Sequence, residues 1–238
     1  MPHMLQVEGL HIEVVRKQVR YLRLSVRRAD GRLRVAAPWH TPEATIRELV
    51  AQKLPWIQKH QAAFLTQAPP PTLQYVAGEM HYYQGVAYPL AVVERPGRPQ
   101  VVLADGHLRL AVPAGSTPAQ RQLALAGWHR AQLQAQLPGL LAKWEPLVGA
   151  RAQSWGIKQM KTRWGTCSLR PRRIWLSLEL SQWPLACLEY VVVHELTHLH
   201  ERLHNARFWH LLGQALPTWQ QPHQLLKQGS LAAAATLA

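Results

Sequence analysis

The chain has 238 residues, enough for one large domain or two small ones, and its 47% hydrophobic content excludes wholesale disorder. Lys and Arg outnumber Asp and Glu by 27 to 13, so the formal charge is +14, and a calcium cage is not expected from so few carboxylates. Two cysteines are too few for a disulfide framework, whereas histidine is abundant, with 13 residues. The sequence shows no signal peptide and no membrane-spanning stretch, so a cytoplasmic location is expected.

A nine-residue pattern occurs twice in the first half of the chain. Residues 30–38 read DGRLRVAAP and residues 105–113 read DGHLRLAVP, which are identical at six of nine positions. In each copy Asp-Gly predicts a tight hairpin turn, and the alternating apolar residues predict a half-buried strand. A Thr-Pro pair follows each copy and predicts a helix N-terminus, so helices are expected over about 42–66 and 118–146. The sequence leaves open whether this is a structural duplication or two similar but separate hairpin–helix units.

The region between the two helices contains a connector and more strands. The proline-rich residues 67–72 predict a stiff connector. Residues 78–94 and 99–112 predict short strands with Gly turns, arranged as an antiparallel meander.

A basic stretch lies in the N-terminal part. Residues 16–34 contain eight Lys or Arg and one acid, and strand alternation places several of them, such as Arg23 and Arg27, on one face. A basic stripe of this kind could contact nucleic acid or face only solvent. No nucleic-acid-binding motif accompanies it.

The second half predicts two strands and a helix. KQMKTRWGTCS, residues 158–168, reads as one strand, and IWLSLEL, residues 174–180, reads as a second strand with alternate residues on one face. Ser181 is expected to cap a helix that begins near Pro184. Apolar residues at helical spacing predict its buried stripe: Leu185, Leu188, Val191, Val192 and Leu196.

This helix contains an HExxH motif, residues 194–198. Residues four apart lie one turn apart on the same face, so His194 and His198 can hold a single ion. Glu195 lies about 100° round the helix, where it can reach a water at the metal without being a ligand. The apolar flanks predict that the His pair is largely buried, and buried imidazoles need partners.

A third ligand is expected downstream. Catalytic zinc takes three protein ligands and keeps one position open, and His204, ten residues after His194, is the leading candidate. For His204 to reach the ion, the chain must turn back within about 199–203. His200 and Glu201 are rivals. On a continuous helix His200 would point away from the pair, and Glu201 could reach the ion only if the helix continued.

The segments MKTRWGTCS, IWLSLELSQWP, LEYVVVHELTHL and LHNARFW closely resemble the YgjP-like metallopeptidase family, relatives of the SprT and WLM zincins. The resemblance implies zinc ligands at His194, His198 and His204, with Glu195 as the catalytic base. It covers most of the chain, because the family also has an N-terminal β-rich part with a basic strand and paired Asp-Gly hairpins. One departure is Ser177, where relatives usually carry Asn.

The sequence therefore predicts an α+β protein. An N-terminal antiparallel β-rich part with helices is followed by a minimal zincin-like metallopeptidase domain with an HExxH active-site helix. The expected divisions are 1–115 for the β-rich part, 116–228 for the metallopeptidase domain and 229–238 for a flexible tail.

The predicted function is that of a zinc-dependent metallohydrolase, most readily a metallopeptidase acting on a peptide or protein. The segment Arg163-Trp164-Gly165 is expected to form a sheet edge that pairs with an extended peptide. Arg163 could anchor a carboxylate or stabilise the oxyanion, or could equally form an ordinary surface salt bridge. Cys167 is expected to be a small buried strand residue rather than a reactive thiol. No Tyr or His donor for the oxyanion can be assigned.

Two alternatives stay open. The same site could hydrolyse the phosphoanhydride of a nucleotide, which the basic surface would suit, although no P-loop or acidic metal cluster supports this. The protein could instead bind nucleic acid and use zinc structurally.

Overall fold

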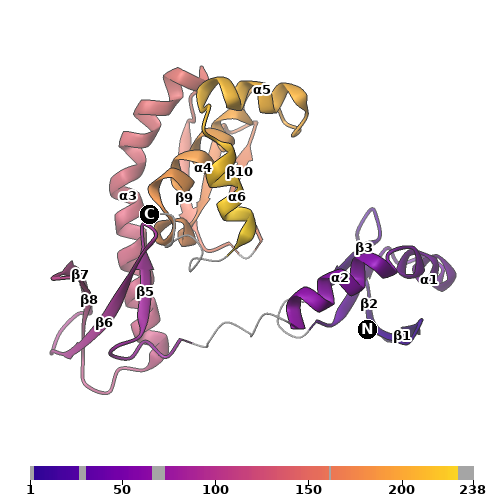
Figure 1. The fold of residues 1–238 in the computed structure, drawn as a ribbon, viewed down its shortest axis with the longest axis horizontal. Coiled ribbons are helices and arrows are strands. Elements are labelled where there is room, and N and C mark those ends of the chain that lie inside the picture. Colours follow the sequence, from indigo (N-terminus) through magenta and orange to yellow (C-terminus); the bar gives the residue numbers. More distant parts are fainter. Residues whose placement is uncertain (1–2, 27–30, 66–72, 161, 230–238) are drawn as a thin grey trace. The chain divides into compact units, whose positions relative to one another are not determined.

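The computed structural model of this protein divides into two compact units, Met1–Thr72 and Leu73–Ala238 (Figure 1). The predicted boundary between residues 115 and 116 falls inside the second unit, and the proposed three-part division stays a prediction. The predicted connector, 67–72, and all of the predicted tail except Gly229 lie outside the described residues. The structure describes residues 3–26, 31–65, 73–160 and 162–229.

The first unit is a four-stranded sheet with two helices. Its strands are β1 (His3–Val7), β2 (Leu10–Arg16), β3 (Arg23–Val26) and β4 (Leu33–Ala37), followed by α1 (Glu43–Gln52) and α2 (Leu54–Leu65). The strand order is β1-β2-β4-β3, with β2 parallel to β4 and antiparallel pairing elsewhere. Alternate residues of the central strands form the core with α1: Ile12, Val14, Leu33, Val35, Ile46 and Val50.

Part of the basic stretch has structural partners in this unit. The Arg16 guanidinium donates to the carbonyl oxygens of Trp39 and Thr41 at 2.9 and 2.7 Å. Arg34 forms an ion pair with Glu13 at 3.5 Å. Arg23 is exposed, whereas Arg27, which was expected on the same face, lies outside the described residues.

The second unit begins with another four-stranded sheet of the same topology. Its strands are β5 (Met80–Tyr83), β6 (Val86–Glu94), β7 (Gln100–Ala104) and β8 (His107–Val112), in the order β5-β6-β8-β7. The first turn of each sheet also has the same conformation: φ is 48° and 75° at Glu8-Gly9, and 50° and 84° at Gln84-Gly85. The repeat therefore extends over the whole four-stranded unit, which favours a structural duplication.

The α+β class is confirmed, but the expected antiparallel meander is wrong. The central strands β6 and β8 are parallel, and β7 lies at the sheet edge, paired with β8. Apolar alternation fixes which face of a strand is buried and carries no information about which edge a hairpin joins. The predicted Asp-Gly hairpin is present in the second copy, where Asp105 and Gly106 have φ of 49° and 71°, the left-handed conformation that a type I′ turn requires. Asp30 of the first copy lies outside the described residues.

A 31-residue helix, α3 (Pro118–Val148), joins this sheet to the rest of the unit (Figure 1). The sequence predicted its start correctly: Thr117 is the N-cap, forms a capping box with Gln120 and precedes Pro118. Gly149 ends the helix in the left-handed conformation, with φ of 71°. In the described residues no helix has the length and apolar character that a bilayer span requires.

The remainder of the second unit is a small sheet with helices. The strands β9 (Ser154–Lys158), β10 (Gly165–Ser168) and β11 (Arg173–Ser177) lie in the order β10-β11-β9. The 3₁₀ helix η1 (Leu178–Gln182) leads into α4 (Leu185–Thr197), α5 (Ala206–Ala215) and α6 (Gln220–Gln228).

Several expected boundaries in this region are wrong. Of the strand expected over residues 158–168, Lys158 is the end of β9 and Gly165–Ser168 is β10. The second expected strand ends at Ser177. Leu178 and Leu180, which were expected on one face of this strand, are buried within η1 instead. Ser181 does not cap α4, because its hydroxyl donates to the Leu178 carbonyl at 3.0 Å and lies 2.9 Å from His129 Nδ1 on α3.

Helix α4 begins beside Pro184, as predicted, but Leu185 is not part of its buried stripe. Pro184 occupies the N-cap position without a side-chain hydrogen bond, and Leu185 is 42% exposed. The β5–β6 turn docks here, with the backbone N–H groups of Gln84 and Gly85 donating to the Ser181 and Gln182 carbonyls at 3.0 and 2.9 Å. This contact, which joins distant parts of the sequence, holds the segment before α4.

Candidate metal centre

Helix α4 is mainly apolar, and it carries the first two site residues. Val191, Val192, Val193 and Leu196 are all buried in the core of the second unit. Burial on most of the helix surface fixes its rotation. His194 is therefore held half-buried at the cavity side, and Glu195, only 4% exposed, lies beside it.

The chain turns back directly after the motif. Helix α4 ends at Thr197 and His198 is its C-cap, so the helix ends slightly before the predicted turn at residues 199–203. Asn205 then caps α5, its side-chain oxygen accepting from the Phe208 N–H at 3.0 Å. His204 is thereby held between the end of one helix and the start of the next.

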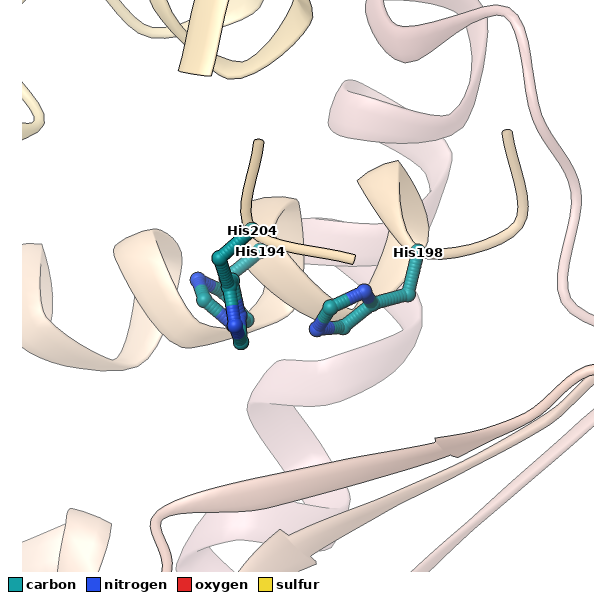
Figure 2. A group of neighbouring side chains, drawn as sticks. All are labelled: His194, His198 and His204. Atoms are coloured by element: carbon teal, nitrogen blue, oxygen red, sulfur yellow. The ribbon is translucent and has the colours of Figure 1, made fainter. Parts of the chain in front are cut away.

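The turn brings three histidines together, as the sequence predicted. Possible ligand atoms of His194, His198 and His204 all lie within 4.8 Å of one another. Figure 2 shows the ring of His198 pointing toward those of the other two. The fully buried ring of Phe208 packs against all three imidazoles, with ring centroids 4.7 to 4.9 Å apart.

The donor set fits a metal ion. The Nε2 atoms of His194 and His204 lie 2.9 Å apart, and a bound cation would satisfy both lone pairs. His198 Nδ1 lies 3.0 Å from the Glu201 carbonyl oxygen, which can only accept, so Nδ1 carries the proton and Nε2 is left free as a ligand. Burial and the neighbouring histidines lower the pKa of His194 to about 3, which keeps this ring neutral, as a ligand must be.

Glu195 is a buried carboxyl without sufficient partners. Its Oε2 atom has no hydrogen-bond partner among the described residues. Burial raises the pKa of Glu195 to about 8, against a smaller lowering by Arg163. A dication at the adjacent histidines is the kind of opposite charge that would favour its ionised form.

The strand β10 forms the opposite wall of the cavity. The cavity has a volume of about 650 Å³ and is lined by the three histidines, by Glu195 and by Arg163, Trp164 and Gly165, the residues that the sequence placed near the site. A Cβ atom at Gly165 would lie only 2.5 Å from Glu195 Oε1, so the absence of a side chain allows this close approach.

The neighbours of Gly165 have mainly packing roles. The Trp164 carbonyl accepts from the Ser177 N–H at 2.8 Å, which fixes β10 against β11, and the Trp164 ring meets Trp183 edge-on at 5.3 Å. Burial raises the pKa of the Cys167 thiol to about 11, with a further contribution from Glu195. A thiol with so high a pKa is a poor nucleophile, which agrees with the expectation that Cys167 is not reactive. Cys167 lies on a strand as predicted, but it is half-buried and lines the cavity.

The rival ligands lie elsewhere. His200 Nε2 is 2.9 Å from the Val148 carbonyl oxygen on α3. The Glu201 carboxylate accepts from the Leu203 N–H at 3.2 Å and so stabilises the turn. Neither belongs to the group of possible ligands found in the described part of the chain.

Tyr190 and His223 also line the cavity, and the sequence analysis did not identify them. The Tyr190 hydroxyl lies 3.3 Å from His194 Nδ1 and 2.8 Å from His223 Nδ1. Tyr190 could have been noticed, because it lies four residues before His194 and hence on the same helix face. His223 lies on α6 and has no local motif, so only the tertiary packing brings it to the site.

Comparisons with known proteins identify the family of this chain. The model of the YgjP-like metallopeptidase domain matches residues 20–229. Among solved structures, the metallopeptidase zymogen abylysin of Pyrococcus abyssi is similar at 18% identity, with a TM-score of 0.36, over 39% of this chain and 92% of that chain. No curated protein matches the chain. Because the family model spans most of the sequence, the chain belongs to the YgjP-like metallopeptidase family.

Proposed function

We propose that this protein is a zinc-dependent peptidase in which His194, His198 and His204 hold the ion and Glu195 is the general base. The observation that carries the proposal is the convergence of three imidazoles and one buried carboxyl on a single cavity. Family membership implies a metal ion and a peptide or protein substrate. Three imidazole ligands and an open position are the arrangement that catalytic zinc prefers.

The proposed reaction is hydrolysis of an amide bond. When bound, zinc would polarise the scissile carbonyl and acidify the attacking water. Glu195 accepts a proton from that water at its carboxylate and later delivers it to the leaving nitrogen. Because Glu195 is only 4% exposed, bulk water has little access to its carboxyl.

We further propose that the substrate pairs with β10. The strand order leaves β10 at an edge of the three-stranded sheet, and its first residue, Gly165, lies against Glu195. An extended peptide added at this edge would pass beside the base. Arg163 is exposed and lines the same cavity, where its guanidinium could bind a substrate carboxylate or the developing oxyanion.

A turnover assay tests the proposal. Zinc-loaded protein should cleave members of a mixed peptide library, detected by mass spectrometry, and a chelator should abolish cleavage until zinc is returned. Parallel incubations with nucleoside triphosphates test the alternative, hydrolysis of a nucleotide phosphoanhydride. Phosphate or pyrophosphate release without any peptide cleavage would contradict the peptidase proposal and favour the nucleotide alternative. DNA binding with steep salt dependence and no turnover would instead favour a structural zinc.

A further inference from the structure

The hydroxyl of Tyr190 joins a proposed zinc ligand to a second histidine. It lies 3.3 Å from Nδ1 of His194 and 2.8 Å from Nδ1 of His223. Tyr190 is 5% exposed, and its ring meets both imidazoles edge-on, with centroids 5.7 and 5.6 Å apart. The hydroxyl is therefore held in place by packing, and its two partners come from α4 and α6.

Metal binding by His194 would fix which group donates in each of the two hydrogen bonds at the Tyr190 hydroxyl. His194 turns Nε2 toward His204 and so offers that nitrogen to the ion. A ligating nitrogen carries no proton, so the proton of the neutral ring is on Nδ1, which donates to the Tyr190 oxygen. The tyrosine proton is then donated to His223 Nδ1. This arrangement satisfies all three groups, since the hydroxyl accepts once and donates once.

The direction of the hydrogen bond from the Tyr190 hydroxyl determines the tautomer of His223. Because its Nδ1 accepts from Tyr190, the proton of a neutral His223 must be on Nε2. His223 lines the same cavity as Glu195 and the three proposed ligands. A neutral N–H donor in such a cavity can stabilise the carbonyl oxygen, which gains negative charge when an amide is attacked.

We infer that Tyr190 is a positioning residue that directs Nε2 of His194 toward the metal and sets His223 as an Nε2–H donor in the cavity. The inference rests on the proposed function, because it takes His194 as a zinc ligand. It adds a hydrogen-bond partner for that ligand and a candidate donor for the oxyanion.

The substitution Tyr190→Phe tests the first part, because it removes the hydroxyl and keeps the buried ring. Loss of such a ligand partner weakens metal binding about tenfold or more. Competition titration with a chromophoric chelator should show this weakening. Tyr83→Phe is the matched control, since the Tyr83 hydroxyl contacts Gln132 and Gln136 on α3 and not the site. Its zinc affinity should equal that of the wild type.

The second part is tested by the histidine tautomers. Nitrogen-15 NMR of zinc-loaded wild type should show His223 protonated on Nε2, and Tyr190→Phe should lose that preference. An Nδ1–H tautomer of His223 in the wild type would overturn the inference, as would equal zinc affinity of Tyr190→Phe and wild type. Either result leaves the proposed function intact if the wild type binds zinc. A wild type that binds no zinc overturns both.

Discussion

Replacing Glu195 with glutamine is expected to lower kcat/KM for peptide cleavage by about a thousandfold or more and to leave zinc content unchanged. Glutamine has nearly the same shape but cannot accept a proton, and general-base catalysis contributes about 10²–10⁴-fold. The fold should tolerate the change. Burial raises the pKa of Glu195 to about 8, so without metal the carboxyl is mainly neutral near pH 7, and a neutral amide of nearly the same shape adds little cost of burial.

Three measurements on Glu195→Gln check this prediction: turnover, zinc per chain and the thermal unfolding midpoint, which should be equal to or above that of the wild type. Glu201→Gln is the matched control. Its carboxylate accepts from the Leu203 N–H in the turn, an interaction that an amide oxygen can retain. Its ion pair with the exposed Arg207 is long, at 3.9 Å, and contributes little, so activity should be nearly unchanged. A Glu195→Gln protein with near wild-type activity would contradict the role of Glu195 as the base.

Replacing Gly165 with alanine is expected to lower kcat/KM about a hundredfold while zinc is retained. The new Cβ would lie 2.5 Å from Glu195 Oε1 and 2.8 Å from its Cγ, so one group must move. The backbone of β10 is held by its pairing with β11, including Gly165 opposite Leu176. The carboxyl therefore moves, and a displacement of about 1 Å can cost about a hundredfold in rate.

The control for Gly165→Ala is Gly127→Ala on α3. Nothing lies within 4 Å of a Cβ atom built at Gly127, and alanine favours a helix, so this variant should keep full activity and equal or greater stability. Steady-state kinetics and thermal unfolding of both variants separate a local from a global effect. Full activity in Gly165→Ala would show that the position of Glu195 in this structure is not required.

The parts of the site that the sequence predicted are those set by local rules. The spacing of His194 and His198 requires only helical geometry, and His204 requires only a turn within a few residues. The start of α3 at Thr117 follows from a capping box, which is also local. Such features depend on neighbouring residues, so a single sequence contains the information to predict them.

The parts that could not be predicted depend on distant contacts. The parallel pairing of β6 and β8 is a choice of sheet edge, which apolar alternation does not specify. The local sequence predicts that Ser181 is a helix cap. Its hydroxyl instead donates to the Leu178 carbonyl and lies beside His129, 52 residues away. His223 reaches the site only because α6 packs against α4. No pattern near these residues indicates the partner.

The central claim is that His194, His198 and His204 together hold zinc, and metal content tests it most directly. Wild type, His204→Ala and the control His210→Ala, which changes an exposed histidine on α5, should be dialysed with zinc and measured by mass spectrometry. The wild type and His210→Ala should each retain about one zinc per chain. His204→Ala should retain far less, because two ligands hold the ion weakly. Unchanged zinc in His204→Ala, or no zinc in the wild type, would contradict the account.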